Sequence, residues 1–373
     1  MHALTTTILF LIVLAILVFV HELGHFLAAK KFGIRVDEFG LGFPPRMFGK
    51  KYGETVYSLN WIPFGGFVKI FGESPDSESL EGPDKNRSLV AKPRWQQVIV
   101  LIAGILFNFI FAWILISFAF MAGVASSKES YAEKYPTHFQ DSRIIVSLVN
   151  PGSPAAGAGL KGGDVIVGFT SGATQIKGDT LDIEAIRTEI ATSEGKPVTF
   201  SIKRGEEIVE KNVVAERGII ADKYAVGISM DEVGTLSLPA HYAIYEGGRF
   251  TVHLIIGTAT GLFDLVVNAF RGEANLSSVT GPVGIAGLVG DAAGLGFAYL
   301  CMFTALISIN LGVLNLIPFP ALDGGRILFV TIEAIRRKNI SPKIANTVNA
   351  VCFGLLLLLM LIVTFKDVWN LWK

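Results

Sequence analysis

Residues 8–25 read ILFLIVLAILVFVHELGH, an unbroken apolar run that ends in two histidines and a glutamate. About 20 apolar residues cross a bilayer as a helix, so Ile8–Val20 reaches that length only if the helix continues through His21–His25. Ionisable side chains at the end of such a helix are costly, and groups placed there usually serve a function. The stretch therefore predicts a membrane-spanning helix with a functional site near one end.

The composition of the whole chain agrees with a membrane protein. Of 373 residues, 51% are apolar and 17% are charged, with 32 Lys and Arg against 32 Asp and Glu. A soluble domain carries about 25% charged residues, and a disordered chain has low hydrophobicity and high net charge. The zero net charge and the absence of a basic patch argue against a nucleic-acid-binding protein. Cys301 and Cys352 both lie in apolar runs, so no disulfide framework or Cys-based zinc site is expected.

Four charge-poor stretches predict four transmembrane helices. The expected fold class is a multi-pass α-helical membrane protein with an inserted β-rich domain and a membrane-associated β-hairpin. The expected segments are a first transmembrane helix with the HExxH sequence (1–30), a cytoplasmic hairpin and linker (31–94), a second transmembrane helix (95–127), an extracytoplasmic β-rich domain (128–217), a linker with an interfacial amphipathic helix (218–291), a third transmembrane helix with the Leu-Asp-Gly sequence (292–325), a cytoplasmic loop (326–343) and a fourth transmembrane helix (344–373).

The sequence His21-Glu22-Leu23-Gly24-His25 has the spacing of a zinc site on a helix. Positions i and i+4 share one face, so two imidazoles can bind one Zn²⁺ while the neighbouring glutamate activates a water. A catalytic zinc site usually has a third protein ligand. Asp323 is the carboxylate of the third apolar stretch. It is either that ligand or part of an Asp-Gly turn that caps the next helix.

The expected topology favours Asp323 as the ligand. The positive-inside rule places the basic segments 30–94 and 326–343 in the cytoplasm. A single crossing between the first and third spans then brings His21 and Asp323 to the same side of the membrane. A further span at residues 250–270 would put Asp323 and the basic loop outside. Residues 250–270 are therefore expected to lie in the interface as an amphipathic helix.

Two segments between the spans have β patterns. Residues 143–215 combine alternating strands with a Gly-rich turn at 151–166 and a helical stretch at 181–191. This order resembles a PDZ domain of the protease-associated type. The resemblance implies a groove that takes a peptide C terminus or an extended segment by strand addition. Residues 54–71 read as a β-hairpin whose aromatic residues suit the membrane interface.

Taken together, these motifs resemble the site-2 protease family of intramembrane zinc metalloproteases, in particular the bacterial regulator-of-sigma-E protease type. The resemblance rests on His21–His25, on Gly104 with Asn108, on the PDZ-like insertion, on Ser278–Ala286 and on Asn315–Gly324. There are two departures. Ile105 stands where the family often has Pro, and one PDZ domain replaces the two of enteric members, which leaves the details of substrate gating open.

The resemblance implies a zinc metalloendopeptidase of a bacterial cytoplasmic (inner) membrane, with its active site near the cytoplasmic side. His21, His25 and Asp323 would hold the Zn²⁺ cofactor, and Glu22 would be the general base. The implied partners are single-span membrane proteins, such as pre-trimmed anti-sigma factors or signal-peptide remnants, together with the lipid bilayer. No nucleic acid is implied.

The resemblance also implies substrate-binding residues. Asn108 and Asn315 are polar groups inside apolar spans, and they hold the substrate backbone or oxyanion, or else bond neighbouring helices. Gly65, Gly66 and Phe67 lie in the hairpin, which resembles the family's membrane-associated β-loop. Its edge strand could pair with a substrate segment that has been locally unwound.

Two other classes of protein are compatible with ionisable residues in spans. The first is a zinc or proton transporter, which needs polar residues across the bilayer, and Ile8–Val20 has none. The second is a catalytically silent PDZ scaffold in the membrane. A scaffold has no physical need for Glu22 at the end of an apolar helix, so both classes rank below a protease.

Overall fold

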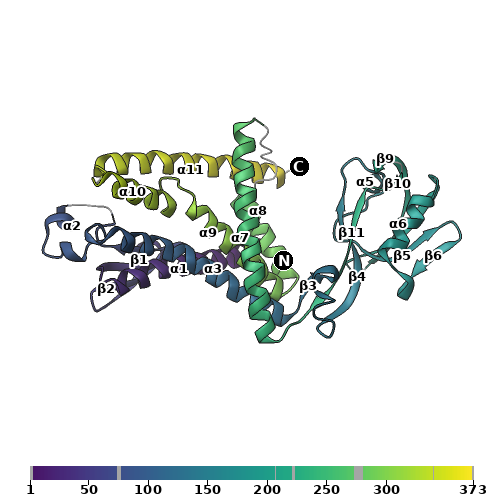
Figure 1. Cartoon of the computed structure of the whole chain (residues 1–373), viewed down its shortest axis with the longest axis horizontal. Coiled ribbons are helices and arrows are strands. Elements are labelled where there is room, and N and C mark those ends of the chain that lie inside the picture. Colours follow the sequence, from purple (N-terminus) through teal and green to yellow (C-terminus); the bar gives the residue numbers. More distant parts are fainter. Residues whose placement is uncertain are drawn as a thin grey trace. The chain divides into compact units, whose positions relative to one another are not determined.

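The computed structural model describes residues 3–73, 77–205, 207–220, 223–272, 280–338 and 340–371. It contains two compact units, which we call the helical unit (Met1–Met121 with Pro239–Lys373) and the β unit (Ala122–Leu238). Figure 1 shows long helices beside a small sheet in the first, and strands with one longer helix in the second.

Long apolar helices make up most of the helical unit. Within the described ranges, five are long and apolar enough to cross a membrane: α1 (Ala3–Lys31), α3 (Arg94–Ala122), α7 (Ala240–Phe270), α9 (Phe297–Leu316) and α11 (Pro342–Leu371). The chain is therefore a multi-pass membrane protein. Four of these helices coincide with the expected spans. The fifth, α7, contains the segment expected in the interface, so the count of four spans stays a prediction.

Two further helices of this unit precede and follow α9 along the chain. Helix α8 (Pro282–Gly294) packs its Val289 against Val13 and Leu17 of α1. The family-like stretch Ser278–Ala286 ends within the first part of α8, and its first two residues, Ser278 and Val279, lie outside the described residues. Helix α10 (Asp323–Arg336) follows α9 after a short loop, and it covers the end of the predicted third span (292–325) and much of the predicted cytoplasmic loop (326–343). Apolar residues spaced at helical intervals, such as Ile327 and Val330, explain why this segment is helical.

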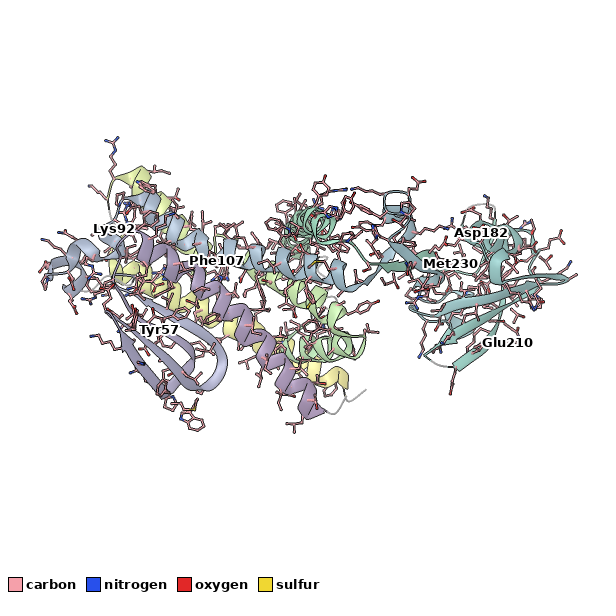
Figure 2. The ribbon with its side chains drawn as sticks, turned by 90° about the horizontal axis from the view of Figure 1, so that it is seen from below. Tyr57, Lys92, Phe107, Asp182, Glu210 and Met230 are labelled. Atoms are coloured by element: carbon pink, nitrogen blue, oxygen red, sulfur yellow. The ribbon has the colours of Figure 1, made fainter. Side chains whose placement is uncertain are left out.

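A small antiparallel sheet packs against α1, and it is built from β1 (Val36–Tyr52) and β2 (Thr55–Ile70). Both strands are bent, and Phe39 pairs with Tyr57 on one side and with Val68 on the other. The first part of β1 therefore lies between the two arms of β2. The predicted reversal within 54–71 is present, but its arms do not pair with each other as a simple hairpin would. Figure 2 labels Tyr57 in this sheet.

The β unit has one main sheet and a flanking helix. Its strands follow the order β3-β11-β4-β5-β7-β8, and β6 pairs with β5. The elements are β3 (Val124–Ser127), β4 (Phe139–Val149), β5 (Val165–Ser171), β6 (Thr174–Lys177), α6 (Ile183–Thr192), β7 (Pro197–Arg204), β8 (Glu207–Val214), β9 (Glu216–Ile220), β10 (Lys223–Ala225) and β11 (Ile228–Leu236). Because β11 lies between β3 and β4, the unit runs past the predicted boundary at residue 217.

Short elements complete the chain. They are α2 (Ser77–Glu81), α4 (Lys128–Tyr131), α5 (Pro154–Gly157) and 3₁₀ turns at Lys85–Arg87, Leu89–Ala91 and Gly178–Thr180. In the β unit, the Gly-rich turn is held by Asp164, whose buried carboxylate accepts hydrogen bonds of 2.7 Å from Arg204 and 2.8 Å from the Lys161 amide. Burial alone would raise the pKa of Asp164, but these donors hold the pKa below its usual range.

Candidate metal centre

The two histidines of α1 and the first residue of α10 meet inside the helical unit. His21 and His25 lie one turn apart, are 7% and 6% exposed, and have their Nε2 atoms 3.2 Å from each other. Asp323 places Oδ2 3.0 Å from Nε2 of His21 and 3.3 Å from Nε2 of His25. One ligand atom from each residue lies within 4.8 Å of the others. The three residues predicted as metal ligands are thus brought together.

The polar atoms of this cluster suit a cation. Oδ2 of Asp323 is buried and accepts no hydrogen bond from the residues that the structure describes, although both imidazoles are near. An unsatisfied buried oxygen is costly. Nδ1 of His25 lies 2.8 Å from the carbonyl oxygen of Val100 and donates to it, which leaves the Nε2 lone pair directed at the cluster. Two imidazoles and one carboxylate are the donor types that zinc prefers, so these residues fit the ion.

Asn108 of α3 lies beside the first histidine. Its side chain is fully buried, and its amide nitrogen is 3.1 Å from Nδ1 of His21. Its Oδ1 atom has no partner among the described residues. The two ends of an amide are exchangeable assignments, and turning this one lets Oδ1 accept the proton of Nδ1. In that orientation, Nε2 of His21 is left free to face the cluster, just as Nε2 of His25 is.

Close contact between α1 and α3 brings these groups together. A Cβ added at Gly104 of α3 would overlap the imidazole ring of His25, and one added at Gly24 of α1 would overlap the carbonyl of Ala103. Both positions therefore need glycine for close helix approach rather than for an unusual backbone angle. The Gly104 and Asn108 positions of the sequence motif thus each touch one histidine.

The Gly104→Ala variant is expected to bind zinc about tenfold more weakly, because the added methyl group turns the His25 ring or moves α3 away. Competition with a chromogenic chelator measures that affinity. Gly257→Ala on α7 is the matched control, because a Cβ there meets nothing within 4 Å. Equal zinc affinity in the two variants would show that this contact does not position the ring.

Glu22 is bonded to the small sheet. Its Oε2 accepts a hydrogen bond of 3.0 Å from the backbone amide of Val68, in the arm of β2 that forms an edge of the sheet. A Cβ built at Gly66 would lie 4.0 Å from the Glu22 side chain, so this edge passes next to the glutamate. Gly65 packs near Val18 of α1. The predicted residue Gly66 therefore borders the glutamate, and Gly65 lies beside Val18, one helical turn before it.

Two other predicted residues lie further from the ligands. The ring of Phe67 covers Gly40 of β1 within the sheet. Asn315 is half-buried in the last turn of α9, before the loop that leads to Asp323, and the described contacts do not join it to the three ligands. The backbone groups of Val68 and Val100 could not be predicted from the sequence, because a backbone amide or carbonyl has no sequence signature.

Comparison with known proteins agrees with this geometry. The profile of Peptidase family M50 matches residues 9–359. A putative zinc metalloprotease of Clostridium perfringens is 39% identical over 96% of this chain and 97% of its own length. The regulator of sigma-W protease RasP of Bacillus subtilis is 30% identical over 98% of this chain and 99% of its own length. A putative zinc metalloprotease of a Nostoc species is 35% identical over 93% of this chain and 91% of its own length. The chain therefore belongs to peptidase family M50, the site-2 protease family.

Proposed function

We propose that this chain is a zinc-dependent intramembrane endopeptidase that cuts the transmembrane segments of single-span membrane proteins. The observation that carries the proposal is the meeting of His21 and His25 with Asp323. The histidines and Glu22 lie on α1, which is long enough to span a membrane, and Asp323 follows α9, which is also long enough. Related chains carry the name zinc metalloprotease, and RasP of Bacillus subtilis is named regulator of sigma-W protease. A membrane-anchored anti-sigma factor, trimmed beforehand by another protease, is the proposed substrate class.

The ligands and the glutamate divide the chemistry between them. His21, His25 and Asp323 would hold Zn²⁺, which supplies a Lewis acid for the scissile carbonyl and activates water. Glu22 would accept a proton from the attacking water and deliver it to the nitrogen of the leaving amine. The Val68 amide would hold the Glu22 carboxylate in reach of both atoms. Asn315, at the end of α9, is proposed to hold the substrate backbone near the reacting bond.

The sheet edge beside Glu22 suits an unwound substrate. A transmembrane helix has its amides paired internally, so the segment to be cut must first be extended. The β2 arm from Gly66 to Ile70 forms an edge of its sheet and passes the glutamate. We propose that the extended segment pairs with this edge, because strand addition satisfies its backbone groups inside the membrane.

Asn108 is proposed to orient His21 rather than to contact substrate, since its amide is buried against Nδ1 of that ligand. Asn108→Leu is then expected to weaken zinc binding by 10- to 100-fold, the usual cost of losing a group that orients a ligand. Chelator competition and kinetics separate the two roles. A higher KM with unchanged zinc affinity would instead favour substrate binding. Ser308→Ala is the control, because Ser308 bonds only the backbone oxygen of Asn108 in the described contacts.

We also propose a bacterial cytoplasmic membrane with the metal centre near the inner side, four spans, and the β unit outside. The contact of Asp323 with both histidines supports this arrangement, because it requires α9 to run in the same direction as α1. In that case α7 lies in the outer interface. Exposed apolar residues along α7, such as Val252, Ile256 and Phe263, suit contact with lipid.

The β unit contains a groove that fits the proposed PDZ role. A cavity of about 660 Å³ lies between α6 and β11, lined by Ile190, Val226 and Met230 among others. Figure 2 labels Asp182 next to the start of α6 and Met230 on β11, the two elements that border the cavity. Glu210 of β8, also labelled, does not line the cavity. Because β3 pairs only with Val233–Leu236, the part of β11 along the cavity is open on that side within the described residues. We propose that this groove takes an extended peptide or its C terminus.

Removing the β unit is expected to relax the need for prior trimming of the substrate. Ser127 of β3 and Val233 of β11 are paired, so an Asn-Gly turn can replace residues 128–232 and leave a short hairpin. The shortened protein should keep its zinc and cut substrates with intact outer domains, which the full chain rejects. Cleavage assays on trimmed and intact substrates measure the ratio. An unchanged preference for trimmed substrate would defeat the gating role.

A direct test of the proposed activity uses purified protein in proteoliposomes with a tagged single-span substrate whose outer domain has been removed. Mass spectrometry of the products should locate the cut inside the apolar segment. Cuts confined to the loops outside the membrane would contradict the proposal. Metal flux into the vesicles without peptide cleavage would favour a transporter.

A further inference from the structure

The loop that leads to Asp323 is hydrogen-bonded to α11 through the side chain of Asn349. The loop, residues 317–322, has two prolines without an amide hydrogen, Pro318 and Pro320. The amides of Ile317, Phe319 and Leu322 donate to carbonyl oxygens of the loop itself or of the last turn of α9. The amide of Ala321 instead donates outward, over 3.2 Å, to Oδ1 of Asn349 in α11.

The residue that makes this hydrogen bond, Ala321, has a strained backbone conformation. Ala321 has a φ of +79°, in the left-handed region that residues with a Cβ atom rarely adopt. Such a conformation persists only when surrounding contacts hold it. Asp323 follows two residues later as the first residue of α10, so a change at Ala321 moves the carboxylate directly. The preceding residue, Leu322, provides no side-chain cap for α10.

Helix α11 offers few other contacts of this kind. Most of its central residues, from Leu355 to Ile362, are exposed apolar side chains. At the Asn349 end, a cavity of about 460 Å³ lies between α11, α10 and α3, lined by Ala321, Asn346 and Asn349 among others. Because the cavity leaves open space beside Asn349, side-chain packing does not hold the loop 317–322 on the side that faces α11. The hydrogen bond from the Ala321 amide to Asn349 holds the loop there instead.

We infer that Asn349 is a positioning residue for the metal ligand Asp323, acting through the Ala321 amide. The inference rests on the proposed role of Asp323 as a zinc ligand. The bond holds Ala321 in its left-handed conformation, and that conformation directs Oδ2 of Asp323 at the two histidines. Helix α11 thereby contributes to zinc affinity although its residues do not touch the metal site.

The test compares zinc affinity, measured by chelator competition, in four variants of the full-length protein. Asn349→Leu is expected to bind zinc about tenfold more weakly and to lower kcat with little change in KM. Asn349→Asp keeps the acceptor and should stay within about twofold of wild type. Asn346→Leu makes the same change one turn earlier on the same cavity and should also stay within that range. Ala321→Gly, which adopts a positive φ freely, should recover most of the loss in the Asn349→Leu background.

Two results would overturn the inference. One is an Asn349→Leu protein that binds zinc as tightly as Asn346→Leu. The other is a loss that Ala321→Gly does not reduce, since general misfolding would behave that way. The Asp323→Ala variant distinguishes failure of this inference from failure of the proposed function. If Asp323→Ala keeps its zinc, the ligand assignment itself fails. If Asp323→Ala loses zinc and Asn349→Leu does not, only the positioning role fails.

Discussion

Glu22→Gln is expected to abolish peptide hydrolysis while zinc stays bound. The amide has the shape of the carboxylate and can still accept the Val68 hydrogen bond, but it cannot take a proton from water. General acid–base catalysis contributes about 10²- to 10⁴-fold, and here one group would act at both proton transfers, so kcat should fall by at least about 10³-fold. Parallel cleavage of a tagged, trimmed single-span substrate by wild type and variant measures the loss, and metal analysis measures the zinc.

A control variant separates loss of the base from general damage. Glu246→Gln changes another buried glutamate of the helical unit, on α7, and should cut at the wild-type rate. Equal cleavage by wild type and Glu22→Gln would point to a contaminating protease. Full biological activity of Glu22→Gln in cells would support a silent scaffold instead.

Asp323→Ala is expected to lose both zinc and activity. The substitution leaves two imidazoles, and two ligands hold zinc far less firmly than three. The affinity should fall by more than about 100-fold, beyond the range usual for groups that only orient ligands. Chelator competition measures the fall. Asp264→Ala, on the exposed face of α7, is the control and should retain the metal.

The opposite result would change the assignment of the third ligand. An Asp323→Ala protein that keeps a full complement of zinc would mean that another group completes the site. Asp323 would then have the alternative role given by the sequence, as part of an Asp-Gly turn at the start of α10.

The long helices of the fold were predictable because hydropathy acts along the chain. Runs such as Ile8–Val20 need no tertiary information, and α1, α3, α9 and α11 lie where the runs are. The sheet next to α1 was less predictable. Residues 36–41 contain a glycine and two acidic residues, so they lack the alternation of a strand, yet residues 38–41 pair on both sides. Their pairing depends on β2, which comes later in the chain.

The three candidate metal ligands were predictable from the sequence, whereas the groups that orient them were not. The HExxH spacing places two histidines on one helical face without further knowledge, and topology then selects Asp323. The contact between Asn108 and His21 could not be derived, because the rotation of α3 about its axis is set by packing at Gly104. The same holds for the bond from Val68 to Glu22, which depends on a backbone group. Long-range packing, rather than local pattern, decides such contacts.

The distance in sequence between the ligands has a consequence for biosynthesis. His21 and His25 are translated well before Asp323, because α3, the β unit and α9 are made in between. In the proposed ligand set, a nascent chain that has already inserted α1 and α3 has two of the three ligands and is expected to hold zinc weakly. With the proposed ligand set, we therefore expect the protease to stay inactive until α10 has been made and has folded.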